Sequence, residues 1–105
     1  PVWYWDPYPQ DCGLENLLHN LSDTVYVSVD LDVLDPSVMS AVGTPEPGGM
    51  VWHQLVSLLS KVAETRRIVG FDVCELSPGD GPPACSYTAA KLVYKLAAFS
   101  CRESG

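Results

Sequence analysis

The stretch TVYVSVDLD, residues 24–32, combines a run of strand-forming residues with two acids at its carboxyl end. Val, Thr and Tyr are enriched in strands, so this run predicts a buried β-strand. Side chains two residues apart in a strand lie on the same face, and we therefore expect Asp30 and Asp32 to converge on one point. Two hard oxygen ligands there suit Mg²⁺ or Mn²⁺ better than Zn²⁺. A solvated turn around Asp35 and Pro36 is the alternative interpretation.

The order of elements around this strand predicts an α/β fold. Residues 13–21 place leucines on one helical face, and residues 33–50 form a long loop rich in Pro and Gly. An amphipathic helix is expected at 51–65, a second buried strand at 67–73, and a closing helix at 86–99. Strand, helix, strand, helix is the pattern of a parallel sheet with right-handed crossovers.

A second group of acids follows the second predicted strand, where Asp72 and Glu75 occur. Ligands of open α/β sheets bind outside the carboxyl ends of the strands. If the two strands are parallel neighbours, Glu75 enters the same crevice as Asp30 and Asp32. For Asp72, a capping or supporting role and a direct role both stay open. The two acidic strand ends together predict a site more strongly than either does alone.

Composition and charge restrict the classes of function. The chain has 105 residues, 47% of them hydrophobic, which is typical of one globular domain. Its net charge of -7 argues against a nucleic-acid partner and favours cationic ligands. No apolar run approaches the roughly 20 residues of a membrane span. The chain begins at Pro1 with no signal peptide in view, so we expect it to be a piece of a longer protein, hereafter the full-length protein.

The four cysteines are spaced widely and irregularly, at Cys12, Cys74, Cys85 and Cys101. There is no C-x-x-C pair and no histidine arrangement typical of a zinc site. We therefore expect free thiols in a reducing cytoplasm. Two disulfides in a secreted domain are the alternative, because an even number of cysteines is compatible with such a framework.

Several motifs resemble a known family when they are taken in order. SVDLDVLDP at 28–36, GTPEPGG at 43–49, GFDVCELSP at 70–78 and TAAKLVYKL at 88–96 are similar to the C-terminal third of the ureohydrolases, the arginase and agmatinase family. The resemblance implies a three-layer α/β/α parallel sheet of arginase/deacetylase type, of which the chain holds the βαβα portion. Residues 24–105 would be the C-terminal part of that domain, and residues 1–23, with their short helix, are unassigned.

The resemblance also implies a chemistry, namely hydrolysis of a guanidinium compound by a pair of Mn²⁺ ions. Asp30 would bridge the two ions, Asp32 would bind one of them, and Glu75 would hold the guanidinium group. The cations would lower the pKa of the attacking water, and urea and an amine would be released. None of the chain's residues matches the family's catalytic acid. The full-length protein would be a homo-oligomer acting on a small guanidinium substrate.

The loop sequence bears on the choice of substrate within the family. Glu46 and Pro47 resemble the agmatinase version of this loop, which implies conversion of agmatine to putrescine and urea. Arginase and guanidinobutyrase activities are the alternatives. Ser40 stands where relatives often carry proline, so the loop backbone is expected to differ there.

The chain also departs from the family pattern. The histidine after a Gly-Gly-Asp turn and the Asp-x-His-x-Asp strand end, which supply the other metal ligands, do not occur in this sequence. His19 and His53 stand in other contexts and do not replace them. We therefore expect the remaining ligands to lie outside this chain, and the chain to be inactive by itself.

Two other classes of function compete with this interpretation. A haloacid-dehalogenase-like phosphatase also uses D-x-D after a buried strand, with Asp30 as nucleophile, Asp32 as acid/base and Mg²⁺ bound. That scheme leaves GTPEPGG and GFDVCELSP without a role. The second alternative is a non-catalytic fragment or paralogue, which the absent histidines favour.

Overall fold

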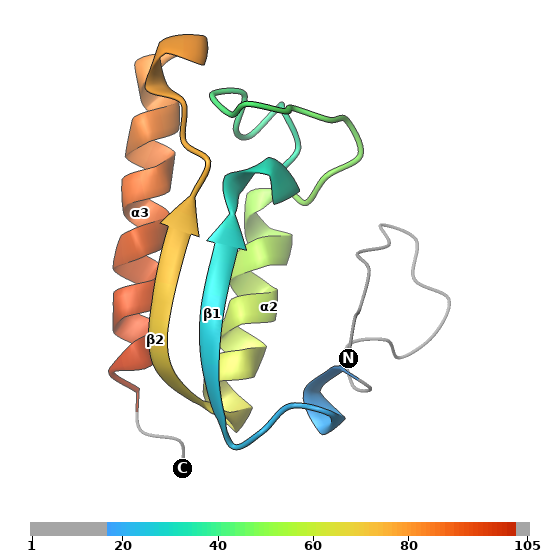
Figure 1. The fold of residues 1–105 in the computed structure, drawn as a ribbon, viewed down its shortest axis with the longest axis vertical. Coiled ribbons are helices and arrows are strands. Elements are labelled where there is room, and N and C mark those ends of the chain that lie inside the picture. The colour runs from blue at the N-terminus through green and yellow to red at the C-terminus, as the bar shows by residue number, and fades with distance from the viewer. Residues whose placement is uncertain (1–16, 103–105) are drawn as a thin grey trace.

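The computed structural model describes residues 17–102, and these form two strands and two long helices (Figure 1). In chain order the elements are β1 (Thr24–Asp30), the one-turn 3-10 helix η1 (Leu31–Val33), α2 (Trp52–Thr65), β2 (Arg67–Cys74), the 3-10 helix η2 (Pro78–Asp80) and α3 (Pro83–Ser100). The predicted order of strand, helix, strand and helix is confirmed. Of the helix predicted at 13–21, residues 17–19 are helical, and residues 13–16 lie outside the described residues.

The two strands pair in parallel, as the order of elements predicted. Val27 pairs with Phe71 and Val29 with Val73, and these apolar side chains pack in the core. The register shifts between Val25 and Tyr26, where β2 contains one extra residue. Because parallel strands place their carboxyl ends at the same edge, β1 and β2 end side by side (Figure 1).

The two helices cover one face of this sheet. Both contact β2, and they also contact each other. The residues that α2 and α3 bury recur at helical spacing and are Leu55, Leu59, Val62 and Ala63 from α2, with Cys85, Ala89, Leu92, Leu96 and Phe99 from α3. Helix α3 begins three residues before the predicted start at Ser86, because Pro83 stands at its first position and has a backbone φ already suited to a helix.

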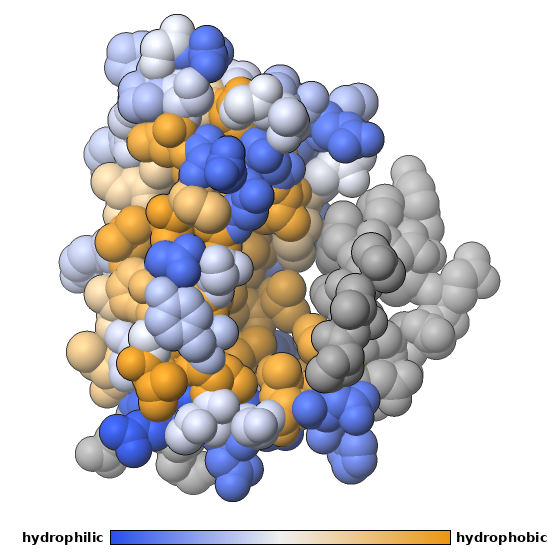
Figure 2. Space-filling view, viewed as in Figure 1, coloured by the Kyte–Doolittle hydropathy of each residue, from blue (hydrophilic) through white to orange (hydrophobic). Residues whose placement is uncertain are grey.

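The other face and the edge of β1 are open within the described residues. Tyr26 is 61% exposed and Val69 is 60% exposed, in agreement with the apolar exposure expected of a sheet that lacks neighbours. A hollow of ≈ 690 Å³ runs along β1, lined by residues of that strand and of α2. Figure 2 shows hydrophobic and hydrophilic side chains interspersed along the strands, and a hydrophilic group over their carboxyl ends. Within residues 17–102, no helix combines the length and apolar character needed to cross a membrane.

Gly49 lies where the long loop returns to the chain that leaves β1. A Cβ atom at this position would lie 2.7 Å from the backbone nitrogen of Asp35 and 2.7 Å from the backbone oxygen of Val33. We predict that Gly49→Ala lowers the free energy of unfolding by about 1–3 kcal/mol, because backbone atoms cannot rotate out of the way. Urea unfolding of the full-length protein measures this loss.

Gly43→Ala is the matched control for that experiment. A Cβ at Gly43 meets no atom within 4 Å, and the residue lies in the same loop. Its substitution is expected to change the free energy of unfolding by less than about 0.5 kcal/mol. Equal losses in the two variants would show that close packing at Gly49 is not the cause.

Candidate metal and guanidinium site

The turn that follows β1 holds the first two acids. β1 ends at Asp30, and Asp32 lies within η1, so the prediction that the strand continues to residue 32 was wrong. Asp30 ends the strand because its Oδ1 accepts a hydrogen bond at 2.9 Å from the backbone nitrogen of Asp32. This side-chain cap turns the chain into the 3-10 helix. A turn, and not the two-residue period of a strand, therefore decides how the two acids lie.

Asp32 has one anchored carboxylate oxygen and one that lacks a partner. Its Oδ2 accepts a hydrogen bond from the Thr44 hydroxyl at 2.7 Å. Its Oδ1 is buried and has no hydrogen-bond partner among the described residues. A buried carboxylate oxygen without a partner is costly, and a bound cation would remove that cost. Asp32 therefore fits the role of a metal ligand.

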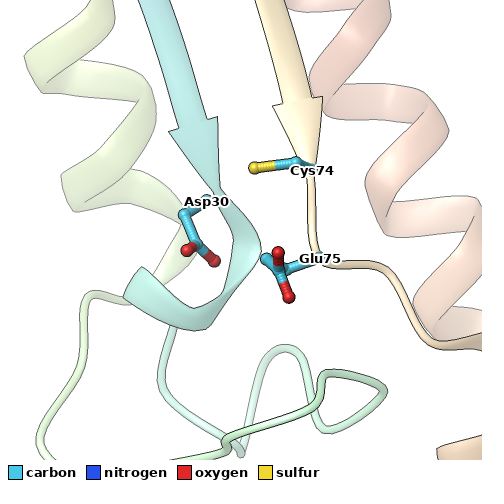
Figure 3. A group of neighbouring side chains, drawn as sticks. All are labelled: Asp30, Cys74 and Glu75. Atoms are coloured by element: carbon cyan, nitrogen blue, oxygen red, sulfur yellow. The ribbon is translucent and has the colours of Figure 1, made fainter.

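Glu75 follows β2 directly and has an unusual backbone. Its φ is 76°, the only positive φ of a non-glycine residue in the described range. This conformation costs about 1–2 kcal/mol for a residue with a Cβ, and such strain is concentrated at functional sites. The turn directs the side chain across the end of the sheet, toward Asp30 (Figure 3).

The strand ends bring three of these side chains together. One ligand atom from each of Asp30, Cys74 and Glu75 lies within 4.8 Å of the others (Figure 3). All three residues are exposed, and Asp32 does not belong to this group. The expected approach of Glu75 to Asp30 is therefore present, while the roles assigned to Asp30, Asp32 and Glu75 stay predictions.

The electrostatics of this edge favour a cation. Desolvation, followed by the negative charges of Asp30, Asp72, Glu75 and Asp32, raises the pKa of the Cys74 thiol. The thiol also donates a hydrogen bond to the backbone oxygen of Val29, at 3.6 Å. A protonated thiol is a poor metal ligand, since metals bind the thiolate. The raised pKa of Cys74 therefore reflects the negative charge around it, and the neighbouring carboxylates are the better metal ligands.

Asp72 lies on the open face of the sheet, in register with Ser28. Its carboxylate accepts hydrogen bonds from the Tyr26 hydroxyl at 2.9 Å and from the Ser28 hydroxyl at 2.8 Å. The hydrogen bond to Asp72 raises the pKa of Tyr26. Gly70 makes room for the Tyr26 ring, because a Cβ there would lie 2.9 Å from it. Asp72 thus joins the two strands and has a supporting position.

Sequence reasoning missed two residues beside the predicted acids. Thr44 lies in the GTPEPGG motif, but only its hydrogen bond to Asp32 shows what the residue does. Cys74 appeared only as a widely spaced cysteine, although its place before Glu75 at a strand end was a usable signal. Within the described residues Cys74, Cys85 and Cys101 are free thiols, in agreement with the first interpretation of the cysteines. Cys12 lies outside the described residues.

The remaining sequence predictions concern histidines and the loop. His19 and His53 are both exposed, and neither belongs to the acidic group at the strand ends. Ser40, the residue at the family's proline position, has its hydroxyl 3.7 Å from the Cys85 sulfur. That contact joins the loop to α3.

Comparison with known proteins identifies the family. The family model described as "Arginase family" matches residues 7–98 of the chain. The chain belongs to the arginase family. Its open acidic strand ends are therefore part of a ureohydrolase fold, and the resemblance noted in the four motifs is confirmed. The α/β fold class is confirmed with it.

Curated relatives of this arginase-family chain carry ureohydrolase names. The N(1)-aminopropylagmatine ureohydrolase of Thermus thermophilus is 44% identical over 92 residues, which are 88% of this chain and 31% of the relative. The agmatinase of Pyrococcus horikoshii is 36% identical over 87 residues, 83% of this chain and 31% of the relative. The chain thus spans less than a third of the length of these relatives.

Solved structures agree with the sequence comparison. Proclavaminate amidino hydrolase from Streptomyces clavuligerus superposes with a TM-score of 0.75 at 34% identity, covering 83% of this chain and 29% of that structure. The agmatine ureohydrolase of Thermoplasma volcanium gives a TM-score of 0.71 at 34% identity, covering 87% and 31%.

Proposed function

We propose that the full-length protein is a manganese-dependent ureohydrolase that acts on agmatine or a closely related amine. The observation that carries this proposal is the meeting of Asp30 and Glu75 at the strand ends, in an arginase-family chain whose Asp32 also has a buried Oδ1 without a hydrogen-bond partner among the described residues. Family membership disfavours the phosphatase alternative. The histidine ligands that this chain lacks would come from the rest of the full-length protein.

The residues of the chain fit a cation at the metal position. Asp30 has an exposed carboxylate with one oxygen held by the backbone, and Asp32 offers a buried oxygen that has no hydrogen-bond partner within residues 17–102. Carboxylate oxygens are the ligands that Mn²⁺ prefers, and removing a carboxylate oxygen from water without a partner is unfavourable. Bound cations would supply the Lewis acidity that lowers the pKa of the attacking water. In our proposal Asp30 would be a ligand of both ions and Asp32 a ligand of one.

Glu75 would bind and orient the substrate. A carboxylate can accept two parallel N–H bonds from a guanidinium group, which fixes the plane of that group as well as its charge. Because Glu75 and Asp30 lie close together, the bound guanidinium carbon would be held near the metal ligands. Such positioning lowers the barrier by holding the reacting groups in a productive arrangement.

The substrate is proposed from the loop sequence and the relatives. Glu46 and Pro47 resemble the agmatinase loop, and the chain carries a net charge of -7. Arginine bears a carboxylate beside its amine, and a site built for agmatine would leave this group unpaired at a cost of a few kcal/mol. The name of the Thermus thermophilus relative makes N(1)-aminopropylagmatine a second candidate of the same chemistry. We further propose a cytoplasmic homo-oligomer.

Comparing substrates tests this proposal. We expect manganese-loaded, full-length protein to release urea from agmatine or N(1)-aminopropylagmatine with a kcat/KM at least about 100-fold higher than from arginine or guanidinobutyrate. Both preferred compounds end in a cationic amine, and both disfavoured compounds carry a carboxylate. A preference for arginine or guanidinobutyrate would overturn the substrate assignment. Absence of urea from all four compounds would favour the non-catalytic alternative.

A further inference from the structure

The loop of residues 34–50 contacts both halves of the candidate site. On one side Thr44 donates its hydrogen bond to Asp32. On the other side Val42 forms an antiparallel bridge with Leu76, the residue after Glu75. The backbone oxygen of Ala41 also accepts a hydrogen bond from Ser77 at 2.7 Å. One loop therefore joins the turn that carries Asp32 to the segment that carries Glu75.

Asp35 ties the two ends of this loop together. Its Oδ1 accepts a hydrogen bond from the backbone nitrogen of Gly48 at 3.0 Å. Its Oδ2 accepts from the backbone nitrogen of Ser37 at 3.0 Å and from the Ser37 hydroxyl at 2.5 Å. Its own backbone nitrogen donates to the oxygen of Met50 at 2.8 Å. The carboxylate therefore links the beginning of the loop to its end.

The segment that carries Thr44 depends on this link. Residues 39, 41, 42 and 50 are buried and anchor the loop through apolar contacts, whereas residues 43–48 are exposed. Gly48, at the end of the exposed segment, adopts a φ of 89° and donates to Asp35. Exposed segments with few apolar contacts open easily. The hydrogen bond to Asp35 is thus the side-chain contact that holds this segment at its far end.

The same hydrogen bonds keep Asp35 charged. The hydroxyl and backbone of Ser37, followed by the backbone of Gly48, lower the pKa of its carboxyl group. A carboxyl group with a lowered pKa stays ionised to a lower pH than an ordinary aspartate, and it keeps its strength as an acceptor there. The hydrogen bonds that link the Asp35 carboxylate to Ser37 and Gly48 are therefore present at neutral pH.

We propose that Asp35 is a positioning residue that holds Thr44 against Asp32. It thereby presents to a cation the Oδ1 of Asp32, which has no hydrogen-bond partner among the described residues. The inference rests on the proposed function, because it assumes that Asp32 binds a metal. In this role Asp35 acts through the loop and is not itself a metal ligand. Groups that orient a metal ligand typically change metal affinity by about 10–100-fold when they are removed.

A double-mutant cycle in the full-length protein tests this proposal. Mn²⁺ is titrated into metal-free Asp35→Asn, Thr44→Val and the double variant, and binding is measured by calorimetry. Each single variant is expected to bind Mn²⁺ at the Asp32 position about 10-fold more weakly than the parent. The double variant is expected to bind Mn²⁺ no more weakly than the single variant with the lower affinity. Both substitutions act through the same hydrogen bond, from Thr44 to Asp32, so their effects should not add. Thr44→Ser keeps the hydroxyl and should restore parental affinity.

Asp80→Asn is the matched control. Asp80 also accepts a hydrogen bond from a serine, but that serine is Ser77 within its own turn. This variant should bind Mn²⁺ as the parent does. Parental affinity in Asp35→Asn, or losses that add to about 100-fold in the double variant, would overturn the proposal. If Asp35→Asn does not fold, as judged by circular dichroism, Ser37→Ala takes its place in the cycle. This variant removes the shortest of the three hydrogen bonds that the Asp35 carboxylate accepts.

Metal titration separates this inference from the proposed function. A parent that binds Mn²⁺ but releases no urea from any guanidinium compound would overturn the proposed function, and the cycle would still decide the role of Asp35. A parent that binds Mn²⁺ and hydrolyses agmatine, with unchanged affinity in Asp35→Asn, would overturn only the positioning role.

Discussion

Replacing Asp30 with alanine in the full-length protein is expected to remove most of the bound manganese and to lower kcat/KM by at least about 1000-fold, equivalent to about 4 kcal/mol. In our proposal Asp30 serves two cations, so its loss weakens both positions at once. Asp32→Ala removes a ligand of one ion and should lose less metal. Elemental analysis of the purified variants gives the metal content, and urea release gives the activity.

Asp23→Ala is the control for the aspartate variants, because Asp23 is an exposed aspartate just before β1. It should keep the manganese content and activity of the parent. Asp30→Ala with the same metal content as the parent would contradict the bridging role. A larger metal loss in Asp32→Ala than in Asp30→Ala would indicate that Asp32, and not Asp30, is the ligand shared by the two ions.

The second large effect is expected from Glu75→Gln, which should lower kcat/KM by about 1000-fold or more while the manganese content stays unchanged. Glutamine keeps the size of the side chain but removes the charge and one of the two acceptors that a guanidinium group needs. The variant loses a contact to the substrate and not to the metal. We therefore expect kcat/KM to fall while the manganese content does not. Steady-state kinetics with agmatine, combined with elemental analysis, tests this expectation.

Glu64→Gln provides the control for Glu75, since Glu64 is an exposed residue of α2 that forms an ion pair with Lys61 of the same helix, at 3.8 Å. Its kinetics should match those of the parent. A Glu75→Gln enzyme with parental kcat/KM would show that another group holds the guanidinium. A loss of manganese in that variant would instead make Glu75 part of the metal centre.

Much of the fold could be predicted because its signals are local. Val-rich runs predicted both strands, and apolar residues at helical spacing predicted α2, with a start one residue too early at residue 51, and most of α3. The boundaries that failed depend on side-chain hydrogen bonds and caps. β1 ends two residues early because Asp30 caps the following turn, and α3 begins early at Pro83.

The candidate site could be predicted in part. Acids at the ends of two neighbouring parallel strands must lie at one edge, so the approach of Glu75 to Asp30 followed from the βαβ pattern. The hydrogen bond from Thr44 to Asp32 joins residues 12 positions apart through an irregular loop. No periodicity in sequence predicts such a contact, because the path of a loop is set by its tertiary anchors.

By itself, the sequence determined the parallel βαβα order, the family and the set of acids at the strand ends, because hydrophobic periodicity and short motifs are encoded residue by residue. Only the tertiary structure decided how these acids are held. The positive φ of Glu75, the Asp32 oxygen that lacks a partner among the described residues and the hydrogen bonds of Asp35 all occur where the loop of residues 34–50 meets the carboxyl ends of the strands. The loop is anchored there by burial of Met39, Val42 and Met50 in a core shared with α2 and α3, which is a contact among segments distant in sequence.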